Sequence, residues 1–272
     1  STKDKSSRKL VGNLAKVKNN LGNDCFYKSI TKMFDRIIDS PLFPRKIDRD
    51  KDVIGVLNGV LHLDLGSDDP QPHLYQGYSP FIVTKSVDAV YMPYKSNSEG
   101  IGIKGKTRFL HIIKAALREI FPDKDSMMKF LYYISTCLDE VAIKDILFIL
   151  IGWGGNGKSL VMDWFLELLA EYGVKVSPKL YTEGPQGGKA DPELMQLKGS
   201  RLAYAAETSR GDAINSARLK QVTEAKKPGR DLFNSMGSFE SSPTQFLSTN
   251  FEMRILDSDY GTNRRLMCLR LI

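Results

Sequence analysis

Cysteine and histidine are scarce in this chain of 272 residues, with three of each. The three cysteines are far apart in the sequence: Cys25, Cys137 and Cys268. This spacing fits neither a disulfide framework nor the paired spacing of a zinc site, and the histidines are equally scattered. The pattern favours an intracellular, reducing compartment and gives neither residue type a predicted role.

Long apolar runs are also missing. No stretch approaches the roughly 18 consecutive apolar residues that a membrane span needs. Residues 1–9 are polar and basic, without the apolar stretch of a signal peptide behind them. Hydrophobic residues make up 42% of the chain and charged residues 26%, close to the averages of soluble globular proteins, so we expect a soluble protein without a membrane partner.

The two ends of the chain also lack features of natural termini. There is no initiator methionine, and the chain stops inside an apolar, strand-like run that covers residues 266–272. A natural terminus is unusual inside such a run. We therefore expect a fragment of a longer protein whose last domain is incomplete at its C-terminus.

Positive charge is concentrated at the N-terminus. The net charge is +7, and residues 1–51 hold 13 Lys or Arg against 6 Asp, whereas the rest of the chain carries 26 residues of each sign. Such a surplus attracts nucleic-acid phosphates at modest salt, but an ordinary solvated helix face has the same composition. Both interpretations stay open at this point.

The N-terminal part of the chain predicts two amphipathic helices and a small sheet. Apolar residues recur at helical spacing over residues 10–21 and 26–38. Residues 53–57 and 60–63 are apolar strands around Asn58-Gly59, which is typical of a β-hairpin. The stretch that follows is rich in Gly, Pro, Ser and Asp, and short strands are expected there only at residues 81–84 and 90–92.

A second pair of helices and an α/β domain follow. Helical spacing predicts helices over residues 109–120 and 128–138, the second one capped by Asp125 or Ser126. From residue 145 apolar runs alternate with helical patterns, which is the signature of an α/β domain. The runs cover residues 146–151, 160–169, 174–176, 202–206, 246–249 and 266–272.

The strongest motif is a phosphate-binding loop. Residues 152–159 read Gly-Trp-Gly-Gly-Asn-Gly-Lys-Ser, which matches the eight-position Walker A pattern between an apolar strand and an amphipathic helix. Glycines let several backbone N–H groups point at phosphate oxygens, and the helix N-terminus adds partial positive charge. Lys158 should reach the β- and γ-phosphates of ATP, and Ser159 should hold Mg²⁺. The predicted nucleotide-binding residues are Gly152, Gly154, Gly155, Asn156, Gly157, Lys158, Ser159 and Leu160. The alternative is a glycine-rich turn whose Lys and Ser are incidental.

Hydrolysis requires further groups, and three later segments supply candidates. Glu207 follows the run 202–206, at the strand end where ligands bind in parallel α/β sheets, and is predicted to orient Mg²⁺ and water. Asn250 ends the next strand and is predicted to hydrogen-bond the attacking water or the γ-phosphate. Arg264 and Arg265 precede the last run and suit a developing phosphoryl charge. Ordinary alternatives are a solvated strand-end glutamate, a turn asparagine and a rim salt bridge.

The order of these motifs resembles the superfamily III helicases, and most closely the primase-helicases of poxviruses, other large DNA viruses and related phages. The matching segments read GWGGNGKS, LAYAAET, ARLKQVTEAKKPGRDLF, QFLSTN and GTNRRLMCLRL, with a weaker match of IGVLNGVLHLD upstream. The resemblance implies an α/β fold with an AAA+-like P-loop NTPase core at residues 141–272. It also implies a helical collar at 107–140 and a smaller mixed α+β accessory domain at 1–106.

The same resemblance implies a replicative DNA helicase motor. Such proteins form hexameric rings with ATP and Mg²⁺ between subunits, and the neighbouring subunit provides an arginine finger, for which we prefer Arg265 over Arg264. A hairpin near residues 231–241 would move DNA, with candidate contacts at Lys220, Lys226, Lys227, Arg230 and Asn234. The chain departs from relatives by lacking Lys or His at the hairpin tip.

The implied partners are single-stranded or forked DNA, further copies of the chain, and primase and other replication proteins. The implied location is the cytoplasm or the replication site of an infected host cell. Two other functions stay open, a P-loop small-molecule kinase and a nucleotide-dependent DNA clamp or loader. Stimulation of ATP hydrolysis by single-stranded DNA would exclude the kinase, and strand displacement would exclude the clamp.

Overall fold

The chain divides into two compact units, Ser1–Arg49 and Asp50–Ile272. We analysed a computed structural model that describes residues 47–48, 50–65, 71–93, 106–121, 123–138, 145–185, 191–229 and 237–271. The two helices predicted over residues 10–38 lie outside the described residues. Within the described ranges, no helix is long and apolar enough to cross a membrane.

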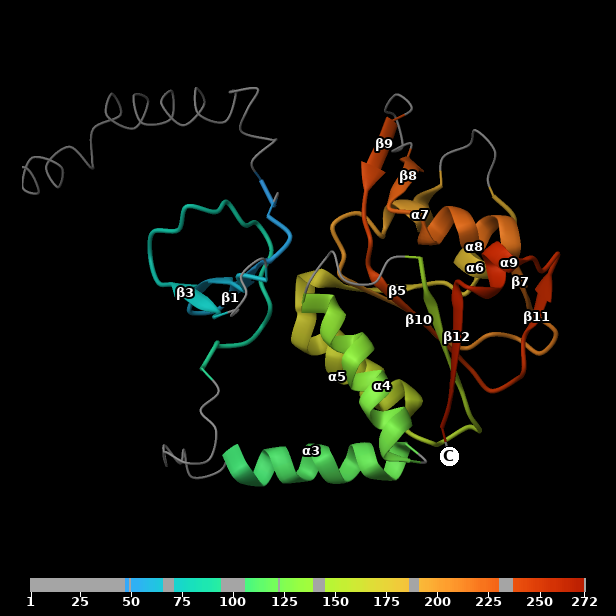
Figure 1. Ribbon diagram of the computed structural model, residues 1–272, viewed down its shortest axis with the longest axis horizontal. Helices are drawn as coiled ribbons and strands as arrows, with labels where there is room; N and C mark the ends of the chain where they lie inside the picture. The colour runs from blue at the N-terminus through green and yellow to red at the C-terminus, as the bar shows by residue number, and fades with distance from the viewer. Residues whose placement is uncertain are drawn as a thin grey trace, which may run out of the picture. The chain divides into compact units, whose positions relative to one another are not determined.

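A parallel five-stranded sheet is the centre of the second unit, as predicted for an α/β fold (Figure 1). Its strands lie in the order β12 (Leu266–Arg270), β4 (Leu147–Ile151), β10 (Thr244–Thr249), β6 (Leu202–Ala205) and β5 (Gly173–Val176). All neighbouring strands in this sheet are parallel. The central strands are buried along nearly their whole length, which explains their continuous apolar runs. The strands predicted at residues 146–151, 174–176, 202–206, 246–249 and 266–272 are confirmed, and the run 160–169 lies in the helix that follows the first of them.

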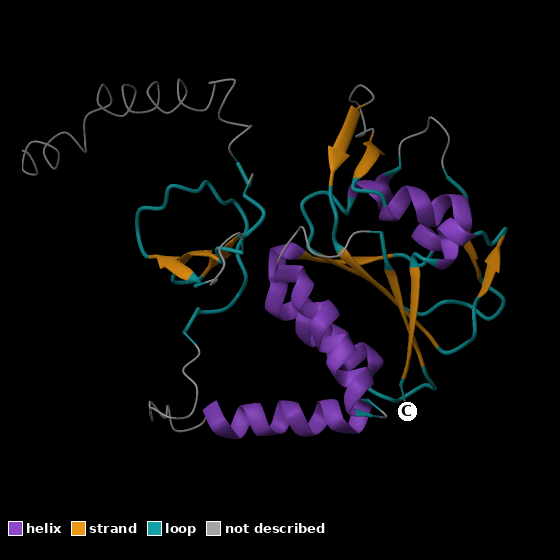
Figure 2. Ribbon diagram, in the orientation of Figure 1, coloured by secondary structure: helices purple, strands orange, loops and turns teal. Residues whose placement is uncertain are grey.

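Alternate side chains of the sheet point into two separate cores. Phe148 and Leu150 belong to the core that includes α3 (Lys106–Ile120), α4 (Lys124–Ser135) and α5 (Lys158–Leu169). Leu147 and Ile149 belong to the other core, with residues of α6 (Lys179–Thr182), α7 (Pro192–Met195) and α8 (Ser216–Thr223). Figure 2 shows the helices on both sides of the sheet. The result is a layered α/β unit of the P-loop NTPase-like kind.

The helices α3 and α4 lie in the region predicted as a collar, but the cap of α4 differs from the prediction. Asp123 caps α4 and accepts hydrogen bonds from the N–H and hydroxyl of Ser126 at 2.7 and 2.9 Å. The prediction of Asp125 or Ser126 was wrong because the helix starts at Lys124. This start makes the Ser126 N–H one of the free donors of the first turn.

A small antiparallel sheet contains β1 (Val53–Val56), β2 (Gly59–His62) and β3 (His73–Tyr75). The predicted hairpin is confirmed, but its turn is Leu57-Asn58, one residue earlier than expected. Gly59 instead opens β2, where a Cβ atom would lie 2.2 Å from the carbonyl oxygen of Tyr75. Glycine is therefore needed here for the close approach of β3.

The strands expected at residues 81–84 and 90–92 do not form, apart from a single bridge residue at Ile82. Backbone groups in this stretch bond to other partners. The N–H and carbonyl of Tyr91 pair with the side chain of Asn58 at 2.9 and 3.0 Å, and the Ala89 carbonyl accepts from the N–H of Leu57. The short strand β3 was not predicted.

Several short elements complete the unit. The strands β7 (Ala213–Asn215) and β11 (Arg254–Leu256) pair in parallel, and β8 (Lys226–Gly229) and β9 (Gly237–Glu240) form an antiparallel pair. The remaining elements are the short helix α9 (Tyr260–Asn263) and two 3₁₀ turns, Thr136–Leu138 and Ala170–Tyr172. The β8–β9 pair lies in the region of the predicted DNA hairpin, and residues 230–236 between its strands lie outside the described residues.

Candidate active site

A pocket of about 410 Å³ lies at the carboxyl ends of three neighbouring strands. It is lined by the loop after β4 and the start of α5, by Glu207 just beyond β6, and by the end of β10. The lining residues are Gly154, Gly155, Asn156, Gly157, Lys158, Ser159, Leu160, Glu207, Ser248, Thr249 and Asn250. Open parallel α/β sheets bind their ligands at this edge. The structure thus brings the predicted P-loop residues together with Glu207 and Asn250.

The loop between β4 and α5 is shaped to hold an anion. Gly157 has φ of 80° as the N-cap of α5, and a Cβ atom there would lie 2.7 Å from Cγ1 of Ile120. Both the left-handed backbone and the missing space require glycine at this position. No side chain caps α5, so the N–H groups of its first turn are free for phosphate oxygens.

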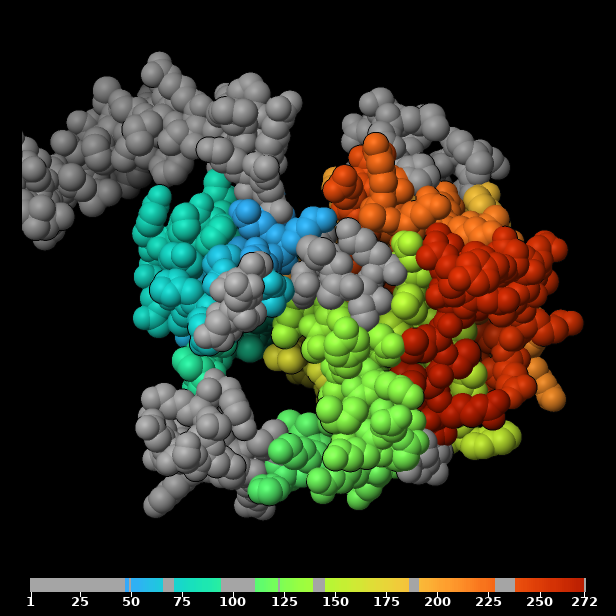
Figure 3. All heavy atoms as spheres, viewed as in Figure 1, coloured from blue at the N-terminus to red at the C-terminus, as the bar shows by residue number. Residues whose placement is uncertain are grey.

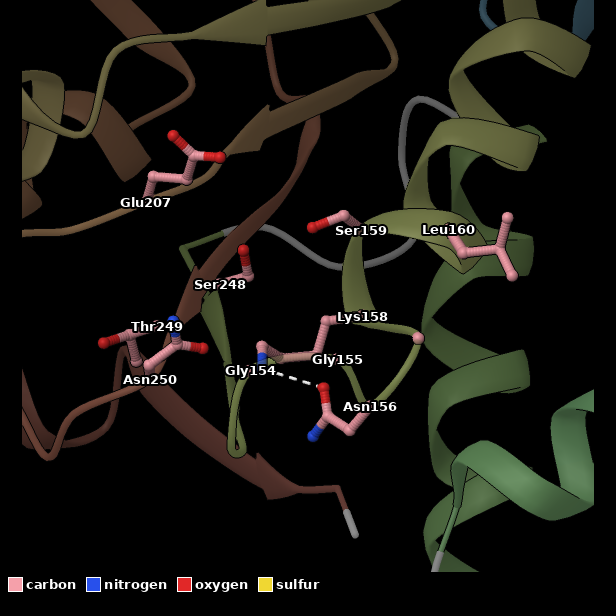
Figure 4. A pocket seen from close by; sticks show the side chains of 11 residues that line it. Gly154, Gly155, Asn156, Lys158, Ser159, Leu160, Glu207, Ser248, Thr249 and Asn250 are labelled. Atoms are coloured by element: carbon pink, nitrogen blue, oxygen red, sulfur yellow. Dashed lines mark hydrogen bonds between the residues drawn. The ribbon is translucent and has the colours of Figure 1, made fainter.

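Lys158 is buried among oxygen atoms of its own loop. Its ammonium donates to the carbonyls of Gly152 and Trp153 at 2.6 and 3.0 Å and to Oδ1 of Asn156 at 2.8 Å (Figure 4). These three contacts satisfy the three donors of an ammonium group. Burial lowers the pKa of Lys158. The amide nitrogen of Asn156 is buried without a hydrogen-bond partner among the described residues. A phosphate group would replace these neutral oxygens with charged ones.

The other polar side chains of the pocket come from different elements. In Figure 4, Ser159, Glu207 and Asn250 surround the space beside the loop, whereas Leu160 points away from it. Leu160 is half exposed, so only its backbone would contribute to the pocket. A serine hydroxyl and a carboxylate are oxygen ligands of the kind that Mg²⁺ prefers. The residues present therefore fit a nucleoside triphosphate with Mg²⁺.

Glu207 has an unusual backbone. It follows β6 with φ of 64°, in the left-handed region that non-glycine residues rarely adopt. Such a conformation costs on the order of 1–3 kcal/mol and persists only where the surroundings enforce it. Strained residues of this kind cluster at functional sites.

Sequence reasoning missed two residues that line this pocket. Ser248 and Thr249 end β10 and are 3% and 2% exposed. Both are polar residues at the end of an otherwise apolar strand, directly before Asn250. That pattern is a usable signal, because polar side chains at a buried strand end require hydrogen-bond partners.

Comparison with known proteins agrees with the resemblance seen in the motifs. No protein-family model matches the chain. The "Putative primase C962R" of African swine fever virus is 25% identical over 262 residues, which cover 95% of this chain and 26% of that protein. The "Putative helicase L207/L206" of Acanthamoeba polyphaga mimivirus is 28% identical over 256 residues, 93% of this chain and 25% of that protein. The chain is related to proteins named as primases and helicases in large DNA viruses. It spans about a quarter of the length of these curated relatives.

Solved structures give a weaker likeness. The apo A form of the NrS-1 C-terminal region is 17% identical, covers 59% of this chain and 37% of that one, and has a TM-score of 0.46. A second apo structure of this region, residues 305–718, is 19% identical and has the same TM-score, over 59% of this chain and 38% of that one. Scores at this level do not establish a common fold.

The arginine pair of this chain, Arg264 and Arg265, lies at the edge of the sheet opposite the pocket. β12 runs parallel to β4 and its first residue, Leu266, pairs with Leu147, so Arg264 and Arg265 precede the strands whereas the P-loop follows them. Five strand residues span roughly 16 Å, which separates the arginines from the pocket of their own chain. Either arginine would have to act on another molecule.

The two arginines differ in their surroundings. Arg265 is 8% exposed and donates to the hydroxyl of Thr223 at 3.2 Å and to the carbonyl of Gly261 at 2.8 Å. Both guanidinium groups lie close to Asp145, at 3.9 Å for Arg264 and 4.0 Å for Arg265, but the side chain of Arg264 is 50% exposed. Arg264 is the more accessible of the two, and the preference for Arg265 stays a prediction.

The predicted DNA-binding residues are also placed unequally. Lys220 pairs with Asp259 at 2.5 Å, and this hydrogen bond holds the pKa of Asp259 well below its usual range. Lys227 is 0% exposed and donates to the carbonyls of Glu224 and Ser241. Its burial speaks against a contact with DNA, so we do not retain it as a DNA ligand. Lys226 is exposed. The last two predicted contacts, Arg230 and Asn234, lie outside the described residues.

The burial of Lys227 predicts a pH dependence of stability. Burial lowers its pKa from 10.5 to about 8, so between these values the unfolded chain binds a proton that the folded chain has lost. Stability therefore rises with pH in this window. We compare the free energy of unfolding of the unsubstituted chain with that of Lys227→Met. The difference between the two should shift by about 2 kcal/mol in favour of the unsubstituted chain from pH 7 to pH 10.

Urea denaturation at four pH values measures this difference. The neighbouring Lys226→Met is the matched control, since it removes an exposed lysine of the same strand and leaves the buried ammonium group in place. A Lys227→Met difference that does not change with pH would contradict the burial of this ammonium group.

Proposed function

We propose that this chain is the ATP-hydrolysing motor of a viral replicative DNA helicase, with an AAA+-like core of the superfamily III type. The decisive observation is that one pocket collects Lys158, Ser159, Glu207 and Asn250 from three separated segments. A triphosphate-hydrolysing site requires this combination of cation, metal ligands and water-orienting groups. The names of the viral relatives, primase and helicase, support the replicative role.

The chemistry follows from the position of each group. Lys158 and the free N–H groups of α5 would hold the phosphates, and Ser159 and Glu207 would hold Mg²⁺, which neutralises charge on the β- and γ-phosphates. Glu207 and Asn250 would orient a water molecule for attack on the γ-phosphate. Groups fixed in advance around developing charge supply most of the rate enhancement in such sites.

The arginines favour an assembly of several copies. Arg264 is half exposed and lies away from the pocket of its own chain, so its guanidinium would serve the pocket of a neighbour. We propose a homo-hexameric ring in which residues 107–140 hold the subunits together. In this proposal residues 1–106 form an accessory domain and residues 141–272 form the motor core. Primase and other replication proteins would be partners of the longer protein, at the viral replication site.

Coupling to DNA would use the β8–β9 hairpin. Lys226 at its base is exposed, and the segment 230–236 connects the two strands. ATP hydrolysis would move this hairpin and carry single-stranded DNA with it. Contacts to phosphates carry no sequence information, so binding should weaken steeply as salt increases.

Measuring ATP hydrolysis with and without single-stranded DNA tests the proposal. We expect the oligonucleotide to stimulate hydrolysis several-fold at low salt, with a smaller effect at high salt as phosphate contacts are screened. A strand-displacement assay with forked DNA and ATP then measures unwinding. A rate of ATP hydrolysis that does not change when DNA is added would indicate a small-molecule kinase. DNA binding without strand displacement would indicate a clamp or loader.

A further inference from the structure

The hydroxyl of Thr249 forms hydrogen bonds with residues from two segments that line the pocket. It accepts a hydrogen bond from the hydroxyl of Thr208 at 2.8 Å and another from the N–H of Phe251 at 3.0 Å. It donates to the carbonyl of Phe251 at 3.0 Å. The carbonyl of Thr249 also accepts from the N–H of Gly152 at 3.2 Å.

These bonds join the three segments that supply the candidate catalytic groups. Thr208 directly follows Glu207, Gly152 opens the phosphate-binding loop, and Thr249 and Phe251 flank Asn250. Figure 4 shows Thr249 beside Asn250, at the end of the strand. The buried side chain of Thr249 thus contacts residues next to Glu207 and Asn250, and its backbone carbonyl contacts the start of the phosphate-binding loop.

The Thr249 hydroxyl has no capacity left for a ligand. A hydroxyl offers one donor and two acceptor lone pairs, and all three are used by protein groups. Thr208 and Thr249 are 7% and 2% exposed. A direct contact with substrate is therefore excluded for this hydroxyl, and what remains is an effect on the position of its neighbours.

Backbone pairing does not supply this connection. The parallel ladder between β6 and β10 ends at Ala205 and Leu247, so Glu207 and Asn250 both lie beyond it. Beyond the last ladder pair, the hydroxyls of Thr208 and Thr249 join the two segments at 2.8 Å. Tyr204, which still belongs to the ladder, contacts Ser248 at 2.8 Å. The Thr208 contact lies next to Glu207, whose left-handed backbone needs such a constraint.

We propose that Thr249, through Thr208, is a positioning residue that sets the spacing between the Glu207 carboxylate and the Asn250 amide. This inference rests on the proposed ATP hydrolysis. Both groups must align the same water molecule, and a misplacement of about 1 Å costs up to about 10²-fold in rate. The binding of the phosphates depends on the P-loop and changes little.

The test is steady-state ATP hydrolysis by Thr249→Val, which removes the hydroxyl and keeps the shape. We expect kcat to fall by about 10- to 100-fold while KM for ATP changes less than about threefold. Thr249→Ser, which keeps the hydroxyl, should recover most of the rate. Thr208→Val, which breaks only the bond between the two hydroxyls, should also lower kcat, and the double variant should be no worse than Thr249→Val, which already lacks that bond.

Thr244→Val is the matched control. Thr244 lies on the same strand, is 3% exposed, and shares a hydrogen bond of 2.8 Å with Thr136 away from the pocket. Loss of the Thr244 hydroxyl breaks one buried hydroxyl pair, as Thr208→Val does, and should lower the thermal midpoint about as much as Thr208→Val. The kcat of Thr244→Val should stay within about twofold of that of the unsubstituted chain, since a lower stability by itself does not displace Glu207 or Asn250.

The outcomes separate two kinds of failure. A Thr249→Val kcat no lower than that of Thr244→Val, or additive losses in the double variant, would overturn the positioning role while leaving ATP hydrolysis intact. If Thr249→Val does not fold, the same comparison is made with Thr208→Val. An unsubstituted chain without ATPase activity, with or without DNA, would overturn the proposed function and this inference with it.

Discussion

Replacing Lys158 with alanine is expected to reduce ATP hydrolysis by about 10²- to 10³-fold, the cost of removing one strong electrostatic contact from a developing transition state. The ammonium lies inside the phosphate-binding loop and would contact both the β- and γ-phosphates. Its partners within the loop are neutral carbonyl oxygens. Charged phosphate oxygens form charge-assisted bonds of roughly twice the strength, which favours the exchange.

The measurement combines ATP hydrolysis with binding of single-stranded DNA at fixed salt. DNA binding should be retained, because Lys158 lies in the pocket and does not belong to the β8–β9 hairpin. Lys179→Ala is the matched control, since the side chain of this lysine is 66% exposed and pairs with Glu183 at 3.5 Å. Unchanged hydrolysis in Lys158→Ala would refute the ATP site, whereas equal losses in both variants would indicate a general defect.

The sequence predicts the sheet and the loop well, for a physical reason. Strands buried on both faces consist of continuous apolar runs, and the Walker A pattern places its glycines, lysine and serine within eight residues, so both features are local. The polar residues Glu207 and Asn250 end two such runs and meet at one pocket, as the parallel arrangement requires. The order of the strands is not local, and it emerges only from the folded chain.

The features that the sequence did not predict depend on contacts between distant segments. Lys227 resembles any surface lysine in a basic stretch, but its ammonium is enclosed by carbonyls of Glu224 and Ser241. Arg265 is equivalent to Arg264 in the sequence, yet only Arg265 reaches Thr223 in α8. The hydroxyl pair of Thr208 and Thr249 spans 41 residues, and no periodicity indicates such a bond. Motif spacing identifies candidate chemistry but does not determine which charged side chains remain accessible.

Glu207→Gln is expected to reduce ATP hydrolysis by about 10²- to 10³-fold while ATP binding stays within a few-fold. Glutamine keeps the shape and one acceptor oxygen but loses the charge that is proposed to orient Mg²⁺ and water. In the proposed site the loop and Lys158 hold the phosphates, so a fluorescent nucleotide should still bind. Equal losses of binding and hydrolysis would assign Glu207 to nucleotide binding alone.

The backbone of Glu207 allows a second test of the same residue. The backbone of Glu207 has φ of 64°. Any residue with a Cβ atom is strained in this conformation, whereas glycine adopts it freely. Two variants that both lack the carboxylate, Glu207→Gly and Glu207→Ala, should therefore differ in stability. We expect the glycine variant to be more stable by about 1 kcal/mol, the reverse of the usual order in which alanine is favoured.

Glu224 provides the control for this comparison, because it is also exposed but has φ of −60°. There the alanine variant should be the more stable, since glycine only adds freedom to the unfolded chain. Urea denaturation of the four variants gives the two differences. If alanine is favoured at both positions, the strain at Glu207 is not real. If glycine is favoured at position 207 and alanine at position 224, the backbone of Glu207 is strained and lowers the stability of the fold. Such a cost is expected of a residue that is positioned for catalysis.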